Sequence, residues 1–180
     1  MSGCHSLMRC ERGAAGAEMA LVLPLLLVLM FSAFELGNYF REWHTLSKSV
    51  RDGARFAARH DFADFDCADE SAADDVVTAT EEVVRTGVAG GTGDLLPNWD
   101  SEDAEMTLSV ACSTSVETGV DADGEAINED LAGIYRGAED GAPVVTLTVR
   151  LPYRGLFGQF GWSGAGLNIA ASEQAAVMGV

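Results

Sequence analysis

A run of sixteen residues without a charged side chain, residues 19–34 (MALVLPLLLVLMFSAF), constrains this chain more than any other feature. As an α-helix the run would rise about 24 Å at 1.5 Å per residue, slightly less than the roughly 30 Å hydrocarbon core of a bilayer. Flanking residues supply the missing length, and Glu18 and Glu35 then fall near the two interfaces. The run therefore predicts a transmembrane helix over residues 14–40.

The alternative is a cleaved secretory signal peptide, whose apolar region is about 7 to 15 residues long. Residues 35–60 instead continue without proline and without a small-residue cleavage pattern. Apolar residues recur there at helical spacing, at Trp43, Leu46, Val50, Ala54 and Ala57. We therefore predict one helix over about residues 14–60, with residues 41–60 as an extension beyond the membrane. Pro24 lies in the membrane part, where a kink is tolerated.

A second face of the extension is basic and carries Lys48, Arg51, Arg55 and Arg59. This stripe is either a solvated helix face or a surface that lies on lipid headgroups or on a neighbouring subunit. Counting Lys and Arg on the two sides of the apolar run would place the N-terminus outside the cell.

The rest of the chain, residues 61–180, is strongly acidic. The whole chain has a formal net charge of -17. Between Asp61 and Asp140 there are twenty-two Asp and Glu but only two basic residues, Arg85 and Arg136. Binding to nucleic acid requires Lys and Arg that displace counterions, so we expect no nucleic-acid partner. The acidity favours a soluble surface or a docking face for a basic partner.

Residues 61–180 also show helix and strand patterns. Residues 71–88 predict a helix that begins with Ser71 and Asp74 as a capping pair and ends at the glycines of residues 89–94. Its predicted apolar face comprises Ala73, Val76, Val77, Ala79 or Thr80, Val83, Val84 and Val88. Alternation predicts strands along Met106, Leu108, Val110 and Cys112 and along Val145, Leu147, Val149 and Leu151, with a last strand over residues 167–178. Residues 120–141 read as a long acidic connection, and residues 155–166 as a glycine-rich turn. The predicted fold class is α+β: a long N-terminal helix followed by a small domain with one or two helices and an antiparallel sheet of about three strands.

No catalytic constellation is visible, and we expect neither an enzyme nor a cofactor. His5, His44 and His60 lack the neighbours of a zinc site, and Ser163 lacks the strand-to-helix setting of a nucleophile elbow. The stretch DADGEAINED fails the EF-hand pattern because glycine follows its second aspartate at once. A weak calcium site remains as an alternative to a solvated loop, with Asp121, Asp123, Glu125, Glu129 and Asp130 as candidate ligands.

Residues 12–40, RGAAGAEMALVLPLLLVLMFSAFELGNYF, resemble the start of the TadE/TadF-like proteins, a branch of the type IV prepilin-like proteins that serves the tight-adherence (Flp) pilus. Members typically read R-G-x-x-x-x-E-F-A-L-V-L-P-L-L-L, and Met19 stands where an aromatic residue is usual. Glu35, Gly37 and Tyr39 fill later positions of the pattern. Residues 145–177 carry a weaker echo of the same family. The resemblance does not separate the TadE from the TadF type.

The resemblance implies that a prepilin peptidase cuts after Gly13, so that Ala14 becomes the first mature residue and Glu18 the fifth. Glu18 would then pair with the new α-amino group of Ala14 on a neighbouring subunit, or place the chain for cutting. The alternative is an interfacial glutamate without a role, since a carboxylate near the interface costs less than the roughly 2 to 3 kcal/mol at the bilayer centre.

The resemblance also implies a topology and a function. Residues 1–13 would be a cytoplasmic leader, and residues 61–180 a periplasmic domain on a single-pass inner-membrane anchor. The protein would be a minor pilin that aids pilus biogenesis and attachment, and it would enter the fibre or stay at its base. Its partners would be the peptidase, other pilins, the inner-membrane assembly platform and the bilayer. The rival is a signal-anchored periplasmic module that binds a cation or another ligand.

Export bears on the four cysteines. Cys4 and Cys10 lie in the leader and would be lost on processing, which leaves Cys67 and Cys112 in the domain. Two cysteines in an oxidising periplasm are expected to pair, with a stabilisation of roughly 4 kcal/mol in the chain-entropy picture. Two separate buried thiols are the alternative.

Overall fold

The structure, a computed structural model, describes residues 11–131, 135, 141–157 and 166–179. Most of the predicted leader, with Cys4, His5 and Cys10, lies outside the described residues, as do Arg136 and most of the glycine-rich turn with Ser163. The elements are α1 (Glu11–Ala57), η2 (Phe62–Asp64), β1 (Phe65–Asp66), β2 (Ser71–Ala72), α2 (Asp74–Thr86), β3 (Glu105–Ser113), β4 (Ser115–Val120), β5 (Ala126–Asp130), β6 (Ala142–Pro152) and β7 (Asn168–Ala176). The α+β fold class predicted from the sequence is confirmed.

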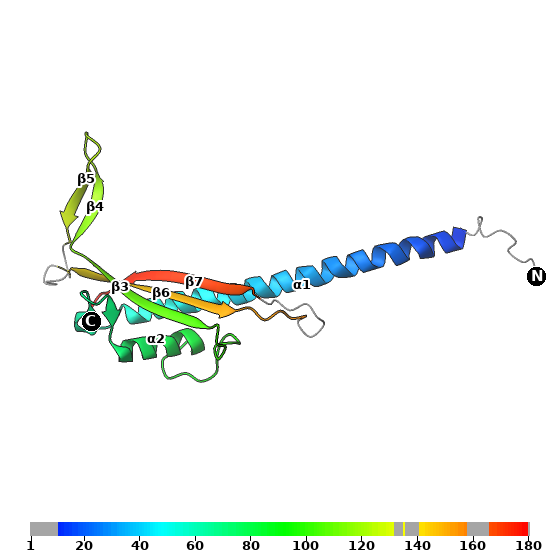
Figure 1. The fold of residues 1–180 in the computed structure, drawn as a ribbon, viewed down its shortest axis with the longest axis horizontal. Coiled ribbons are helices and arrows are strands. Elements are labelled where there is room, and N and C mark those ends of the chain that lie inside the picture. Colours follow the sequence, from blue (N-terminus) through cyan, green and yellow to red (C-terminus); the bar gives the residue numbers. More distant parts are fainter. Residues whose placement is uncertain (1–10, 132–134, 136–140, 158–165, 180) are drawn as a thin grey trace, which may run out of the picture.

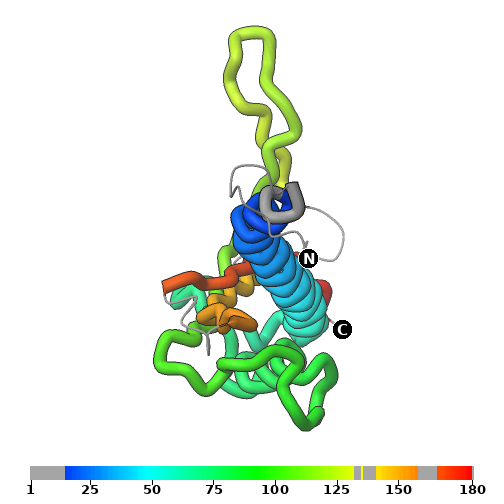
Figure 2. Tube along the Cα trace, turned by 90° about the vertical axis from the view of Figure 1, so that its right-hand side faces the viewer, coloured from blue at the N-terminus to red at the C-terminus, as the bar shows by residue number. Residues whose placement is uncertain are grey.

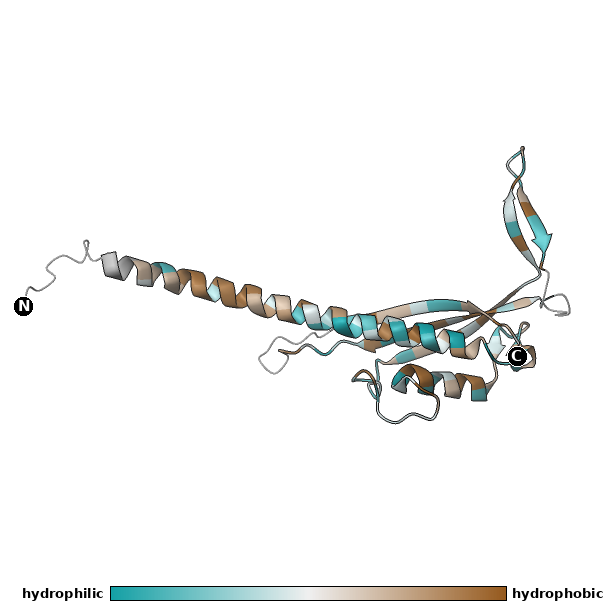
Figure 3. Cartoon of the chain, turned by 180° about the vertical axis from the view of Figure 1, so that it is seen from behind, coloured by the Kyte–Doolittle hydropathy of each residue, from teal (hydrophilic) through white to brown (hydrophobic). Residues whose placement is uncertain are grey.

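Helix α1 runs unbroken through Pro24, and it has two halves with different surroundings. Its first half projects away from the rest of the molecule and is apolar on every side, whereas polar side chains appear where it meets the domain (Figures 1 and 3). From Asn38 onward one face of the helix is buried by the domain, while the other stays exposed. The single long helix expected from residues 14–60 is therefore present, and it ends at Ala57.

The sheet has the order β3-β6-β7 and is antiparallel throughout. Leu147 of β6 pairs with Leu108 of β3 on one side and with Glu173 of β7 on the other. The second half of α1 packs against β7 and β6, and α2 packs beside α1. Alternate residues of β6 point into this layer, which explains why Val145, Leu147, Val149 and Leu151 are completely buried.

The core forms where both helices meet the sheet. Leu46, Val50 and Ala54 of α1 contact the inward side chains of β6 and Val84 of α2. Of the apolar residues predicted to recur along the extension, four are buried and Trp43 is 37% exposed. Gly53 permits the close approach of the elements, because a Cβ there would meet Val84 and lie 3.0 Å from Leu147 Cδ2.

Helix α2 corrects three details of the sequence prediction. Ser71 pairs with Asp66 in the small β1–β2 sheet, so it cannot cap α2, whose N-cap Ala73 makes no side-chain bond. The helix ends at Gly87, which adopts φ 87° as the left-handed cap, before the glycines of residues 89–94. Val88 lies past this cap and is 61% exposed, so it is not part of the buried face.

A hairpin begins before the predicted acidic connection of residues 120–141 and takes up its first half. Strands β4 and β5 pair antiparallel, and Gly124 at φ 86° provides the left-handed position that their turn needs. The sequence reading missed it because the irregularity between Glu117 and Gly119 places Val120 on the opposite face from Val116 and Ile127, so no apolar face marks the strands. Two views at right angles show the hairpin standing clear of the sheet and of both helices (Figures 1 and 2).

Candidate functional site at helix α1 and its junction with the domain

The exposed half of α1 has the composition of a membrane span. Among the described residues, α1 is the one helix long and apolar enough to cross a bilayer, and its most apolar window is entirely unburied by the protein. Residues 15–37 rise about 35 Å, which matches the roughly 30 Å hydrocarbon core with a moderate tilt. A core helix of a soluble protein would instead be covered by its own chain.

The predicted processing residues lie at the start of this half. Gly13 and Ala14 are in the first turn of α1, and Glu18 is exposed one turn later. Within the described part of the chain Glu18 makes no hydrogen bond or ion pair. The cut after Gly13 and the pairing of Glu18 with an α-amino group therefore stay predictions.

The second glutamate of the apolar segment, Glu35, fastens α1 to the segment that follows β6. One oxygen of its carboxylate accepts a hydrogen bond from Tyr153 Oη at 2.9 Å, and the other accepts from the Leu156 amide at 3.1 Å. The rings of Phe31 and Phe157 meet at 5.0 Å on the same side. Hydrogen bonds to a carboxylate are stronger than neutral ones, so this contact fixes the point where the helix leaves the domain.

Next to this contact, Asn38 and Glu42 of α1 form a buried polar cluster with Tyr153. Asn38 Nδ2 donates to Tyr153 Oη at 3.2 Å and to Glu42 Oε1 at 3.1 Å. Burial raises the pKa of Glu42, although the hydrogen bond from Asn38 and the charge of Arg41 oppose the shift. Burial also raises the pKa of Tyr153, which keeps its phenol protonated as a donor. The sequence reading passed over Asn38 and Glu42, although their spacing of four places them on one helix face with Glu35.

The basic stripe of α1 is exposed along its whole length, from Lys48 to Arg59. Arg51 makes a specific contact within it, donating to Glu173 Oε1 of β7 from Nε at 3.2 Å and from Nη2 at 2.9 Å. Glu173 shares a face of the sheet with the buried Leu147, and its ion pair with Arg51 explains why a charged residue is tolerated there. The other three cations of the stripe form no ion pair within the described residues.

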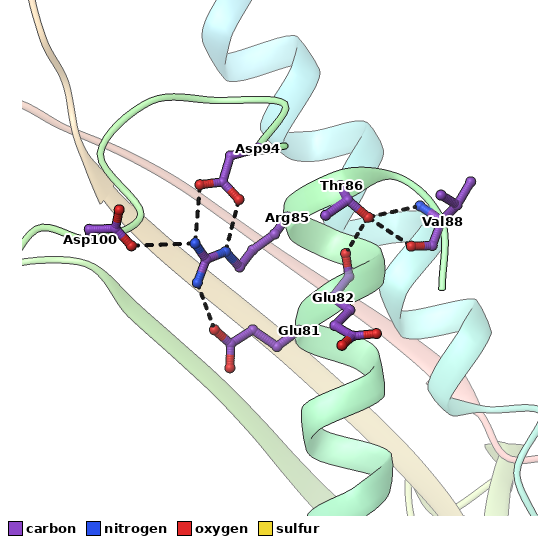
Figure 4. Close-up of polar contacts among 7 residues, drawn as sticks. All are labelled: Glu81, Glu82, Arg85, Thr86, Val88, Asp94 and Asp100. Carbon is purple, nitrogen blue, oxygen red and sulfur yellow. Dashed lines mark hydrogen bonds and ion pairs between the residues drawn. The ribbon is translucent and has the colours of Figure 1, made fainter. Parts of the chain in front are cut away.

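Arg85 of α2 holds the loop that follows its helix. Its guanidinium donates to both carboxylate oxygens of Asp94, at 3.0 and 3.1 Å, and contacts Glu81 and Asp100 (Figure 4). The hydrogen bond with Asp94 raises the pKa of Arg85. The same guanidinium lies 5.7 Å from the ring centre of Trp99, which is buried against the core. This cation therefore organises an acidic surface and covers the core, a role that the sequence alone did not indicate.

The disulfide predicted between the two cysteines of the domain is present. Cys67 and Cys112 are joined, with their Cα atoms 5.6 Å apart. The bridge connects the turn between β1 and β2 to strand β3, and so ties the segment after α1 to the sheet.

The candidate metal and catalytic residues do not converge. No group of three or more His, Cys, Asp or Glu in the described residues could hold a metal ion. Asp121 instead shapes the β4–β5 turn, where its Oδ1 accepts from the amides of Asp123 and Glu125, each at 2.9 Å. The rings of His44 and Trp43 meet edge to face at 5.1 Å, and His60 Nδ1 lies 3.7 Å from Asp64 Oδ2.

Comparison with known proteins gives a match at the N-terminal helix. The family model for TadE-like proteins matches residues 13–55, which include the apolar half of α1 and nearly all of its buried half. No curated protein and no solved structure matches the chain. The echo of the family over residues 145–177 lies outside the match and stays a prediction. Over residues 13–55 the chain is similar to TadE-like proteins.

Proposed function

We propose that this protein is a minor pilin of a tight-adherence pilus system, anchored in the membrane and aiding pilus biogenesis and surface attachment. The TadE-like match over residues 13–55 carries the proposal, because it falls on the helix that would hold the protein in the membrane. The fold supports it: one apolar helix projects from a small domain that packs around the helix's second half.

In this proposal the chain has four parts. Residues 1–13 are a cytoplasmic leader, residues 14–40 cross the inner membrane, residues 41–60 extend the helix, and residues 61–180 form the periplasmic domain. The disulfide between Cys67 and Cys112 supports the periplasmic assignment, because disulfides persist in oxidising compartments. The prepilin peptidase, other pilins and the inner-membrane assembly platform are the proposed partners.

The N-terminal residue of the protein extracted from membranes tests the processing route. We expect a start at Ala14 that is lost in a strain without the prepilin peptidase. A start at Met1 or Ser2 would instead indicate an ordinary signal anchor. A start beyond Phe34 would indicate a signal peptide and would remove the anchoring helix from the mature protein.

The proposed role of Glu18 is tested by Glu18→Ala in the full-length chain. We expect normal insertion into the membrane and a loss of surface pili, since the carboxylate would pair with an α-amino group only during assembly. Ser32→Ala is a matched control, because it also removes a polar side chain from the apolar half of α1. Normal pili in the Glu18→Ala strain would contradict the pairing.

A further inference from the structure

The β4–β5 hairpin has the properties of an arm that lacks its partner. Every residue from Val116 to Asp130 is exposed. Its apolar side chains are included, with Val116 49%, Val120 64% and Ile127 43% exposed. A lone two-stranded hairpin is marginally stable in water and usually needs a further strand or another packing surface. Something outside the described chain is therefore expected to cover it.

The charge of this arm, residues 115–130, restricts what can cover it. The arm carries six carboxylates and no Lys or Arg, at Glu117, Asp121, Asp123, Glu125, Glu129 and Asp130. Register places Val116 opposite Glu129 and Gly119 opposite Ile127, so one face combines apolar and acidic side chains. A complementary surface must therefore offer cations together with an apolar contact.

A surface of that kind lies between α1 and β7 of the same chain. It is a groove lined on the α1 side by Trp43, His44, Ser47, Lys48 and Arg51. On the other side it is lined by Ala170, Ala171, Ser172 and Glu173 of β7. Glu173 pairs with Arg51, so Lys48 is the lining Lys or Arg without an ion pair among the described residues. Because successive side chains of a strand point to opposite faces, four consecutive lining residues indicate that the groove follows the strand's edge. β7 is also the last strand in the order β3-β6-β7, so its outer edge is paired with no described strand.

We propose that the arm of one copy of this protein docks in the α1–β7 groove of a second copy. The arm face that carries Val116, Ile127 and Glu129 would lie on the groove. Its carboxylate would face Lys48 and Arg51, in competition with Glu173, and its apolar side chains would cover Trp43, which is 37% exposed. The arm cannot reach the groove of its own chain in this structure, because it points away from the domain (Figures 1 and 2). If two copies exchange arms, the contact closes as a two-fold dimer, whereas one-way docking builds a ring or an open filament according to the rotation between copies.

The proposed partner is a second copy of the same chain. The docking depends on the proposed function in one respect, that both copies are anchored in the same membrane. Contact between copies is measured in membranes, without reference to pili or to processing. If the two copies do not touch but the cells still make pili with this protein, the docking is wrong and the pilin function stands. If the copies touch but deleting the gene leaves the pili unchanged, the pilin function is wrong and the docking stands.

The first measurement is photo-crosslinking of the full-length chain in membranes. A photoreactive amino acid replaces Ile127 in one copy, and a second copy with a different tag is co-expressed. We expect crosslinks between the two copies that map to residues 43–51 or 168–176. The same amino acid at Val88 is the matched control, since that side chain is also apolar and exposed but lies after α2. Crosslinks from position 127 only to other proteins or to lipid would overturn the proposal.

Charge reversal sharpens the test. Lys48→Glu with Arg51→Glu should lower the crosslink yield at least about tenfold, equivalent to about 1.4 kcal/mol. Arg55→Glu near the end of α1 with Arg59→Glu in the turn that follows makes the same charge change outside the groove lining, and should have little effect. Glu129→Lys in the partner copy, on the arm face that carries Val116 and Ile127, should restore part of the yield, which also excludes simple loss of the Arg51–Glu173 contact. Equal losses from both helix pairs, or no restoration, would overturn the proposal.

Discussion

The two halves of α1 differ in how far their large apolar side chains are exposed. In the first half, large apolar side chains are exposed, from 37% at Phe31 to 80% at Leu21. In the second half, Leu46 and Val50 are 0% exposed, because they face the sheet in a stripe between polar positions. A helix that is apolar all round requires an apolar environment on all sides, whereas a stripe requires one packed partner. The membrane would therefore supply the apolar surroundings of the first half, as the sheet does for the second.

The largest expected effect comes from removing a core contact of the second half. Leu147→Ala should destabilise the domain by about 2–5 kcal/mol, because it leaves a cavity where β6 meets α1 and α2. Leu26→Ala removes the same atoms from the exposed half and should leave domain unfolding unchanged. Guanidinium unfolding of the full-length protein in detergent, followed by the fluorescence of its three tryptophans, of which Trp99 is buried in the domain, measures both. Equal destabilisation by the two variants would break the comparison.

The disulfide acts on the domain alone and should rank next. Cys67→Ser with Cys112→Ser should lower the free energy of unfolding by about 2–4 kcal/mol, since the bridge closes a loop with a sequence separation of 45. The same unfolding curve gives the value. Membrane extraction of the chain should not change, because the exposed half of α1 lies outside the loop. A double serine variant as stable as the original would show that the cross-link is dispensable.

Two glycines of α1 test the difference in surroundings directly. Gly53→Ala should destabilise by about 1–3 kcal/mol, because the added Cβ meets Val84 and Leu147 in a packed interface. Gly37→Ala should be neutral or slightly stabilising, since nothing lies within 4 Å and alanine favours a helix by up to about 1 kcal/mol. Unfolding in detergent compares the pair. Stabilisation by both variants would mean that α1 and α2 have room to move apart at Gly53.

Much of the fold could be predicted from the sequence because its signals are local and periodic. The apolar run, the stripe through Leu46 and Val50, and the alternation along β6 each reflect one buried face. The three-stranded sheet and the Cys67–Cys112 bridge follow from the same local signals and from the count of cysteines. The β4–β5 hairpin could not be predicted in this way, because it packs against nothing and so has no buried face to shape its pattern.

The junction could not be predicted because its partners lie far apart in the chain. Glu35 and Tyr153 are 118 positions apart, so no helix or strand periodicity indicates that they form a hydrogen bond. Arg85 likewise finds Asp94 and Asp100 through the path of a loop rather than through helical spacing. Sequence reasoning placed Glu35 at the end of the apolar run, and the structure adds what its carboxylate binds.

The contact of Tyr153 with Glu35 and Asn38 lies where the two halves of α1 meet, and its removal is the next test. Tyr153→Phe removes the hydroxyl that links Glu35 and Asn38 and should cost about 1–2 kcal/mol in domain unfolding, because a carboxylate loses a donor. Tyr39→Phe is the matched control, as its ring packs on Tyr153 at 5.2 Å and its hydroxyl makes no hydrogen bond among the described residues. Protease sensitivity of the segment after β6 should rise in the Tyr153 variant. Identical behaviour of the two variants would argue against a fixed junction.

The smallest effect concerns Glu42, the buried carboxylate just beyond the junction. Burial raises its pKa above the ordinary 4.5, so the folded state holds its proton more tightly than the unfolded state does. The stability linked to this proton is fully present below the ordinary pKa and is lost as the pH rises through the raised value. Glu42→Gln mimics the protonated form and keeps the acceptor for Asn38, so it should be slightly more stable than the original protein near pH 7. The difference between the two proteins should shrink as the pH falls below about 4.5, where both carry a neutral side chain. Unfolding curves across that range measure it, with Glu173→Gln as a control on β7, where the carboxylate is paired with Arg51. That control should have the opposite sign near pH 7, because it removes an ion pair rather than a buried charge.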